Sequence, residues 1–347
     1  MAGIERIDFL PESDTSIMCK TRIARGAMNL VITGANGFIG KALTHRLLGE
    51  AAVAGGLGAA GCLTLLDLGF EGPELARVRR LPGSIADPTL VARAFDAPVD
   101  VLFHLASIPG GMAEQNYELS RQVNLDATTN LLEAARAQAL ATAKPVTVVF
   151  ASSIAVLGAP LPALVDDTTP LHPRLTYGAQ KLIGEILLDD FSRRGWLDSR
   201  SIRLPGIVAR PPQRTGQMSA FLSDIIQELA AGRSYACPVA AESTTWLMSV
   251  HRVVDNILHA ARMSSAGLAR RAWTLPALRT SMTQLVAAIA EVYGNDVLGR
   301  VTYGSNPALE ANFGRYPPLK TPAAQAAGFA NDGDLATLVR RALLPIQ

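Results

Sequence analysis

A tyrosine and a lysine stand four residues apart in the segment RLTYGAQKLIGE, residues 174–185. Four residues is close to one helical turn, so the side chains of Tyr177 and Lys181 are expected on one face of a helix. A free phenol has a pKa of about 10, and a nearby ammonium lowers that pKa by stabilising the phenolate. The pair could therefore act as a base. Ser153 ends the run TVVFASS, at the carboxyl edge of the predicted sheet, where open α/β folds place their ligands.

A glycine-rich turn follows the first apolar run of the chain. Gly34, Gly37 and Gly40 are spaced three apart in TGANGFIGKAL, directly after NLVIT. Glycines there permit a tight turn and let the backbone approach a pyrophosphate, whose charge is favoured at a helix N-terminus. Asp67 ends the next apolar run, where a carboxylate accepts hydrogen bonds from a ribose diol and repels a 2′-phosphate. The pattern predicts NAD as the cofactor, in preference to NADP.

The elements that must position these residues alternate between short apolar runs and longer helical stretches. Continuous apolar strands separated by helices predict a parallel sheet covered on both faces, a Rossmann-type doubly wound α/β fold. We expect strands in NLVIT, CLTLLDL, VDVLFHLA, PVTVVFAS, RSIRLPGIV and TTWLMSV, and helices over 37–50, 88–96, 113–143, 218–232, 250–263 and near 333–344, besides the Tyr177 helix. The expected organisation is an N-terminal extension (1–27), an NAD-binding domain (28–205) on which 250–265 packs back, and a mainly substrate-binding α/β region (206–347).

Composition excludes several classes of partner. The chain has 347 residues, 49% hydrophobic and 18% charged, and its formal net charge of +2 gives no reason to expect nucleic acid or a membrane surface. The three cysteines contain no CxxC pair and the five histidines are not paired at metal-ligand spacing, so no metal is expected. No apolar run approaches the roughly 20 residues that span a bilayer, so we expect a cytoplasmic protein.

The order of the glycine turn, Ser153, Tyr177 and Lys181 resembles the extended branch of the short-chain dehydrogenase/reductase superfamily, the NAD-dependent epimerase/dehydratase family, over residues 28–345. This resemblance implies that Tyr177 is the catalytic base, that Lys181 also holds the nicotinamide ribose and that Ser153 orients the substrate. It also implies a homodimer. By the same resemblance the cofactor-binding residues are Gly34, Asn36, Gly37, Phe38, Ile39, Gly40, Asp67, Leu68, Ser84, Ile85, Leu105, Ala106, Ser107, Asn124, Tyr177, Lys181, Pro205 and Ile207.

Segments such as TYGAQKLIGE, IRLPGIVARPP and WLMSVHRVVDNILHA are similar to the D-erythronate dehydrogenase group within this family. The similarity implies NAD-dependent oxidation of the C2 hydroxyl of a small sugar acid to the 2-oxo acid. By position, the expected substrate residues are Ser107, Asn124, Ser153, Tyr177, Arg210 and Trp246. Arg210 suits a planar carboxylate, although a solvated loop arginine is an equally weighted interpretation.

Other functions stay open. Nucleotide-sugar enzymes of the family carry an arginine and an aspartate where this chain has Thr245 and Trp246, so an obvious diphosphate ligand is missing. An epimerase, a dehydrogenase of the threonine type and a non-catalytic NAD-binding regulator are the alternatives. Two residues depart from the family pattern: Ser84 stands where an aspartate is common, and Leu157 where a tyrosine is common.

Overall fold

The structure is a computed structural model that describes residues 28–50, 61–75, 77–211 and 218–346. The expected extension 1–27 and nearly all of the Ala/Gly-rich segment that follows the first helix lie outside these residues. The main sheet has seven strands in the order β10-β6-β5-β4-β1-β2-β3, and all neighbouring strands are parallel. Its strands are β1 (Leu30–Thr33), β2 (Leu63–Asp67), β3 (Val78–Pro82), β4 (Val101–His104), β5 (Val146–Ser153), β6 (Leu197–Leu204) and β10 (Ala272–Thr274). This is the predicted Rossmann-type fold.

Helices cover both faces of the sheet because its central strands are apolar on both sides. One core packs α2 (Phe38–Glu50) and α9 (Val250–Arg262) against side chains such as Ile32 and Phe103. The other core packs α3 (Pro88–Ala94), α6 (Ala127–Thr142) and α7 (Thr176–Arg193) against side chains such as Val31 and Leu102. Neighbouring residues of one strand thus enter opposite cores, as expected for a doubly covered sheet. No helix in the described part of the chain is long and apolar enough to cross a membrane.

The register brings the candidate functional residues to one edge. Thr33 pairs with Leu66 of β2 and His104 of β4, and Ser153 pairs with Leu204 of β6. Because all strands are parallel, their carboxyl ends share this edge. The strand order reverses around β1 and β4, the point at which open α/β sheets form a ligand crevice.

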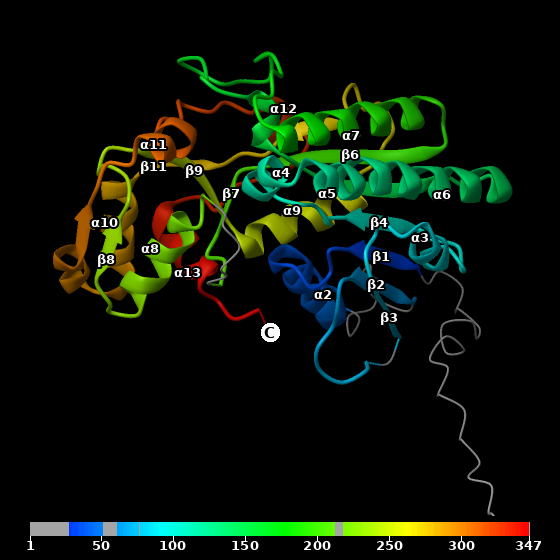
Figure 1. Ribbon diagram of the computed structural model, residues 1–347, viewed down its shortest axis with the longest axis horizontal. Helices are drawn as coiled ribbons and strands as arrows, with labels where there is room; N and C mark the ends of the chain where they lie inside the picture. The colour runs from blue at the N-terminus through cyan, green and yellow to red at the C-terminus, as the bar shows by residue number, and fades with distance from the viewer. Residues whose placement is uncertain (1–27, 51–60, 76, 212–217, 347) are drawn as a thin grey trace, which may run out of the picture.

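Beyond β6 the chain builds a second, smaller region, which lies on the left in Figure 1 with α8, α10 and α13 around their own apolar core. It contains a three-stranded sheet of order β11-β9-β7 and a two-stranded sheet of β12 and β8. The elements are β7 (Gly206–Val208), α8 (Phe221–Ala230), β8 (Tyr235–Cys237), β9 (Thr244–Ser249), β11 (Leu278–Ser281), α10 (Met282–Tyr293), η3 (Asn295–Arg300), β12 (Val301–Tyr303), α11 (Pro307–Phe313) and α13 (Leu335–Ala342). The short helix α12 (Pro322–Ala326) contacts β10 and belongs to the core of the main sheet.

Two expected elements differ from the structure, and two of its strands were not expected. The run RSIRLPGIV is two strands, β6 and β7, in different sheets, since Pro205 has no N–H to continue a ladder. The expected helix over 113–143 is divided into α4 (Gly110–Gln115), α5 (Tyr117–Arg121), a π-helical turn η1 (Gln122–Asp126) and α6. Strands β3 and β10 lack a strong apolar run of their own, and β10 returns from the second region to extend the first sheet.

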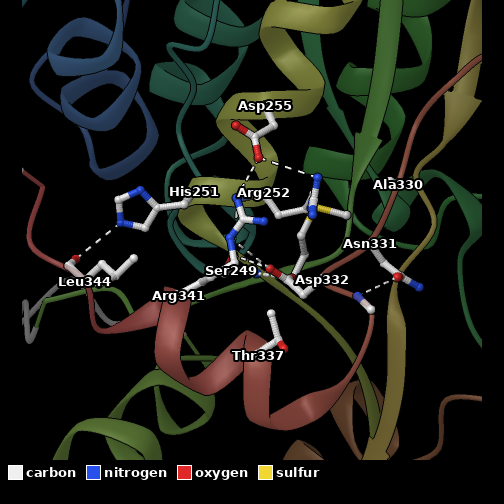
Figure 2. Close-up of polar contacts among 12 residues, drawn as sticks. Ser249, His251, Arg252, Asp255, Ala330, Asn331, Asp332, Thr337, Arg341 and Leu344 are labelled. Carbon is white, nitrogen blue, oxygen red and sulfur yellow. Dashed lines mark hydrogen bonds and ion pairs between the residues drawn. The ribbon is translucent and has the colours of Figure 1, made fainter. Parts of the chain in front are cut away.

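Most of the segment 250–265 forms α9 (Val250–Arg262), which contacts α2, β5 and β6. A polar network holds the start of α9 to the C-terminal helix α13 (Figure 2). The buried carboxylate of Asp332 accepts hydrogen bonds from the backbone N–H of Ser249 (2.9 Å) and from its hydroxyl (2.5 Å). Arg341 donates to Asp255 at 2.6 Å, and Arg252 lies 3.5 Å from the same carboxylate. The network fixes the junction between β9 and α9, where the two regions meet.

Candidate active site

The glycine turn forms a cradle that no larger residue could form. Gly34 has a φ of 71°, and a Cβ there would lie 2.7 Å from the backbone nitrogen of Ala106. A Cβ on Gly40 would lie only 2.1 Å from the carbonyl oxygen of Gly34. The turn therefore packs tightly on the loop after β4 and leads directly into α2, which begins at Phe38. This geometry fits a pyrophosphate at a helix N-terminus.

Asp67 is fixed at the carboxyl end of β2, beside the cradle. Its Oδ2 accepts a hydrogen bond from the backbone N–H of Asn36 (2.8 Å), and its Oδ1 accepts one from that of Leu68 (2.7 Å). The Asn36 amide in turn donates to the carbonyl of Gly69 at 3.0 Å. An oriented carboxylate here suits a ribose diol, as NAD requires.

Tyr177 lies in the first turn of α7, close to the point where β5 ends at Ser153. The hydroxyls of Ser153 and Ser107 both act on the pKa of its phenol. Burial raises the pKa of this phenol, whereas the two serine hydroxyls and the positive charge of Arg210 oppose that rise. A hydroxyl that donates to a phenolate stabilises the charged form.

Lys181 lies one turn further along α7. Its Nζ is 5.7 Å from the centroid of the Tyr177 ring and 4.6 Å from that of Phe150. Burial lowers the pKa of this ammonium to about 7, against the opposing influence of Glu185. Sequence reasoning gave the lysine the main part in making the phenol basic. The influences that lower the pKa of the phenol come from the Ser107 and Ser153 hydroxyls and from Arg210. The part of Lys181 in making the phenol basic stays a prediction.

Arg210 is a partly buried cation facing the same hydroxyls. Its guanidinium lies 5.8 Å from the centroid of the Phe38 ring, and burial lowers its pKa while Tyr177 opposes that effect. The Nε of Arg210 is buried and has no hydrogen-bond partner among the described residues. Its backbone is held by Ser223 and Gln227 of α8. The solvated interpretation of this arginine is therefore wrong, and its position suits an anion between the two regions.

Two residues expected at the substrate are engaged elsewhere. The side chain of Asn124 accepts from the N–H of Ile108 (2.8 Å) and donates to the carbonyl of Ile108 (3.0 Å) and to Gln180 (2.7 Å). Trp246 is 0% exposed, and its indole nitrogen donates to the carbonyl of Pro317 at 2.8 Å. Both side chains have satisfied their polar groups within the chain, so neither offers a free donor to a substrate.

The remaining expected cofactor residues also follow strand ends. Ser84 and Ile85 come after β3, and Leu105 to Ser107 after β4, at the same edge as the glycine turn. The hydroxyl of Ser84 accepts from the backbone N–H of Ala86 (3.2 Å), while Ile85 is buried. Pro205 and Ile207 lie at the passage from β6 to β7. No three His, Cys, Asp or Glu side chains within the described ranges are grouped to hold a metal ion.

Sequence reasoning missed a buried polar layer behind the site. His104 joins Thr33 of β1 (2.7 Å) to Thr128 of α6 (2.8 Å), and its pKa is lowered to about 3 by burial and by Lys181. The imidazole is therefore neutral. The two threonine partners of His104 come from distant segments, which the sequence alone does not bring together.

Glu185 was missed in the same layer. It is 5% exposed and accepts hydrogen bonds from Ser152 (2.5 Å) and from Arg203 (2.9 and 2.7 Å). Its place four residues beyond Lys181 puts it on the same helical face, a signal that was available in the sequence.

Comparison with known proteins agrees with this geometry. The model of the NAD dependent epimerase/dehydratase family matches residues 30–275. A D-erythronate dehydrogenase of Cupriavidus necator is 38% identical to this chain over 318 residues, which make up 90% of this chain and 97% of that protein. A D-erythronate dehydrogenase of Haemophilus influenzae is 31% identical, over 90% of this chain and 98% of its own.

Solved structures show the same architecture. A nucleoside-diphosphate-sugar epimerase from Agrobacterium tumefaciens has a TM-score of 0.83 at 30% identity, covering 90% of this chain and 92% of that one. The L-threonine dehydrogenase of Clostridium difficile shares the fold, with a TM-score of 0.78 at 22% identity over 91% of this chain and 97% of its own. With the glycine cradle, the Asp67 carboxylate and a family match over most of its length, this chain belongs to the NAD dependent epimerase/dehydratase family and is an enzyme that uses NAD.

Proposed function

We propose that this enzyme oxidises the C2 hydroxyl of a small, D-erythronate-like sugar acid to the corresponding 2-oxo acid. Two relatives named D-erythronate dehydrogenase, at 38% and 31% identity, align with nearly the whole chain. The observation that carries the proposal is the buried, unpartnered Nε of Arg210 near the phenol of Tyr177. A small acid carries both groups that this arrangement would recognise, a carboxylate and an adjacent hydroxyl.

The residues at the strand ends would hold the cofactor. The turn from Gly34 to Gly40 would bind the pyrophosphate, Asp67 the adenosine ribose diol, and Lys181 the nicotinamide ribose. When bound, NAD supplies the acceptor for the hydride that leaves C2. The other assigned residues, from Ser84 and Ile85 to Ile207, would complete the walls of that crevice.

The chain's own side chains would perform the remaining chemistry. Tyr177, as the phenolate, would take the proton of the C2 hydroxyl while the carbon–hydrogen bond at C2 breaks. Ser153 would orient that hydroxyl and donate to the oxygen as it becomes a carbonyl. Arg210 would bind the carboxylate in a planar fork and so fix which hydroxyl faces the base. The raised pKa of the free phenol means that the base form requires added positive charge at the site.

A second candidate is epimerisation of a nucleotide sugar, favoured by the solved relative from Agrobacterium tumefaciens that carries an epimerase name. The places of the diphosphate-binding arginine and its neighbour are Thr245 and Trp246, which are 1% and 0% exposed. Both side chains are buried and neither carries a positive charge, so neither offers a ligand to a diphosphate. This argues for the small acid.

The test is the appearance of NADH absorbance when the enzyme is mixed with NAD and a panel of four-carbon sugar acids, threonine and UDP-sugars. We expect turnover of a sugar acid and none of the others. Conversion of a UDP-sugar with no net NADH, and silence with every acid, would replace this proposal by the epimerase. Turnover of threonine alone would replace it by an amino-acid dehydrogenase.

We further infer a homodimer, since Ile186 of α7 and Leu140 of α6 are 61% and 62% exposed on neighbouring helices. Light scattering after gel filtration measures the mass, and a monomer at micromolar concentration would contradict the inference. Location in the cytoplasm stays a prediction from the sequence.

A further inference from the structure

We propose that Ser223 and Gln227 of α8 are positioning residues that fix the backbone of Arg210. The inference rests on the proposed function, in which Arg210 binds the substrate carboxylate, and it adds two residues on which the recognition of an acid depends. Neither side chain would touch the substrate or the cofactor. Both would act through the point from which the guanidinium of Arg210 extends.

Three hydrogen bonds join α8 to the segment that follows β7. The backbone N–H of Arg210 donates to the Oγ of Ser223 at 3.0 Å. The Nε2 of Gln227 donates to the carbonyl of Arg210 at 2.7 Å and to that of Ala209 at 3.3 Å. Because Ser223 and Gln227 are four residues apart, they lie on one face of α8. Both backbone groups of Arg210 are thus bound by a single helix.

The segment after β7 depends on α8 because a sheet does not supply these partners. In the described part of the chain β7 is an edge strand that pairs only with β9, and this pairing ends at Val208. Residues 209–211 have no regular secondary structure. Ala209 and Ser223 are each 5% exposed, so water does not readily replace a partner that is lost there. Removal of either α8 side chain would therefore let the backbone at Arg210 move toward another partner.

The far end of the Arg210 side chain reaches the other region of the molecule. Its guanidinium lies 5.8 Å from the centroid of the Phe38 ring, and Phe38 is the first residue of α2. In an extended arginine the guanidinium is about 6 Å from the Cα atom, so a backbone rotation of about 10° moves it by about 1 Å. A misplacement of about 1 Å in a substrate-binding group costs up to about 100-fold. The two α8 side chains therefore control where a carboxylate could bind.

The first experiment is steady-state kinetics of the holoenzyme with NAD and the sugar acid that it oxidises. Gln227→Met keeps a side chain of similar length without the amide, and Ser223→Ala removes the hydroxyl. We expect either change to raise KM for the acid about fivefold to tenfold, with kcat within about threefold and KM for NAD within about twofold. A general loss of stability would not change KM for one ligand alone.

A double-mutant cycle tests whether Gln227 acts through Arg210. In the Arg210→Met background the guanidinium is absent, so Gln227→Met has nothing left to position. We expect Gln227→Met to change KM for the acid by less than about twofold in that background. A role of Gln227 in stability alone would instead give the same factor in both backgrounds.

Two control variants remove comparable interactions elsewhere. Gln138→Met is matched to Gln227→Met, because Gln138 binds both backbone groups of Val99 at 2.7 Å each, in the other region. Glu228→Gln changes α8 itself, where Arg233 donates to the Glu228 carboxylate at 2.5 Å. Both variants should keep the KM values of the wild type.

A second readout needs no turnover. In protein labelled with nitrogen-15 arginine, the Nε–H signal of Arg210 is the one that Arg210→Met lacks, and its heteronuclear NOE reports order on the picosecond to nanosecond timescale. We expect a lower NOE for this signal in Gln227→Met and in Ser223→Ala than in the wild type. The signal of Arg200, which is 2% exposed and also has a buried Nε without a hydrogen-bond partner among the described residues, should not change.

The proposal is overturned by additive effects of Gln227→Met and Arg210→Met on KM for the acid, or by wild-type KM values in both Gln227→Met and Ser223→Ala. If Gln227→Met does not fold, Gln227→Leu takes its place. If no acid is oxidised, the proposed function is rejected and the NOE decides this inference by itself. A lowered NOE for Arg210 in both variants then supports the positioning role, and an unchanged NOE contradicts it.

Discussion

Glu185 lies four residues beyond Lys181 on α7, yet its carboxylate is bound by Arg203 of β6, at 2.9 Å from Nε and 2.7 Å from Nη2, and not by the lysine ammonium. The negative charge of Glu185 that acts on the buried Lys181 is therefore shared with another cation, Arg203. The Lys181 pKa of about 7 reflects burial, opposed by Glu185. The charge on Lys181 depends on a group that touches neither substrate nor cofactor.

The first prediction concerns Glu185→Gln. Removing this negative charge lowers the pKa of Lys181 further, so the ammonium loses its proton at a lower pH. If the reaction needs a protonated Lys181, the alkaline limb of the kcat profile should move down by about half a unit to one unit. An exposed glutamate on α6 provides the control, Glu133→Gln. A shift toward higher pH would contradict this account.

The same change also affects stability. Arg203 would keep its charge in a site where its side chain is only 15% exposed, and an uncompensated buried charge costs about 3 kcal/mol. Because glutamine keeps an acceptor oxygen, we expect a loss of about 2 kcal/mol in the free energy of unfolding, measured by urea denaturation. The pH profile is interpreted only after this measurement shows a folded protein.

The second prediction is that Tyr177→Phe abolishes turnover and spares cofactor binding. The phenol oxygen is the only atom removed, so kcat should fall about 1,000-fold or more, as expected for loss of a general base. NAD binding, measured by calorimetry, should change less than about threefold, because the cradle and Asp67 are untouched. Tyr293→Phe, at an exposed tyrosine of α10, is the control. Lost NAD affinity with an intact rate would mean that Tyr177 has another role.

The third prediction separates charge from shape at Arg210. Arg210→Lys keeps a cation without the planar fork, and Arg210→Met removes both. We expect KM for the acid to rise about tenfold in the lysine variant and about 100-fold in the methionine variant, with KM for NAD unchanged. The measurement is steady-state kinetics. If both variants change KM for the acid by equal, small factors, Arg210 does not bind the substrate carboxylate.

Local signals in the sequence predicted the parts of the site that one segment builds. Tyr177 and Lys181 share a helix turn, and the Gly34 to Gly40 turn lies between a strand and a helix that its own residues specify. Contacts between distant segments were not predictable in this way. The burial of Trp246 depends on Pro317, which is 71 residues further along the chain. Its sequence position next to the expected substrate segment therefore gave no information about where its indole lies.

The same limit applies to polar partners. Asn124 has an amide that could bind substrate, cofactor or backbone, and its type alone does not choose among them. In the structure the Asn124 amide binds the backbone of Ile108 and the side chain of Gln180, which is 56 residues away in the chain. Likewise β10 is recognised as a strand of the first sheet only through its pairing with β6. Short strands acquire their place from such pairing more than from their own propensity.

The fourth prediction concerns stability at low pH. His104 has a pKa lowered from 6.5 to about 3, so the unfolded chain binds a proton there at pH values at which the folded protein does not. Its contribution to stability is present above pH 6.5 and is lost progressively as the pH falls toward 3. In that window it should contribute a slope of about 1.4 kcal/mol per pH unit to the free energy of unfolding.

Two variants measure this slope. His104→Gln cannot titrate and keeps amide groups for Thr33 and Thr128. The slope of its free energy of unfolding against pH should therefore be smaller than that of the wild type, by about 1.4 kcal/mol per pH unit, the contribution of one proton. His45→Gln, at an exposed histidine of α2, should leave the slope unchanged. Urea denaturation at several pH values gives the result, and an equal slope in His104→Gln and wild type would refute the neutral, buried imidazole.

The last prediction concerns cofactor choice. Asp67→Asn removes the negative charge and keeps an acceptor for the N–H of Asn36, which Asp67 now binds at 2.8 Å. Without the charge, a 2′-phosphate is no longer repelled, so kcat/KM for NADP should rise about tenfold while that for NAD falls about threefold to tenfold. Asp126→Asn changes an exposed aspartate paired with Arg121 and should alter neither value. A wild-type enzyme that already prefers NADP, or a variant with an unchanged ratio of the two kcat/KM values, would mean that the Asp67 carboxylate does not face the ribose, whatever its place at the end of β2.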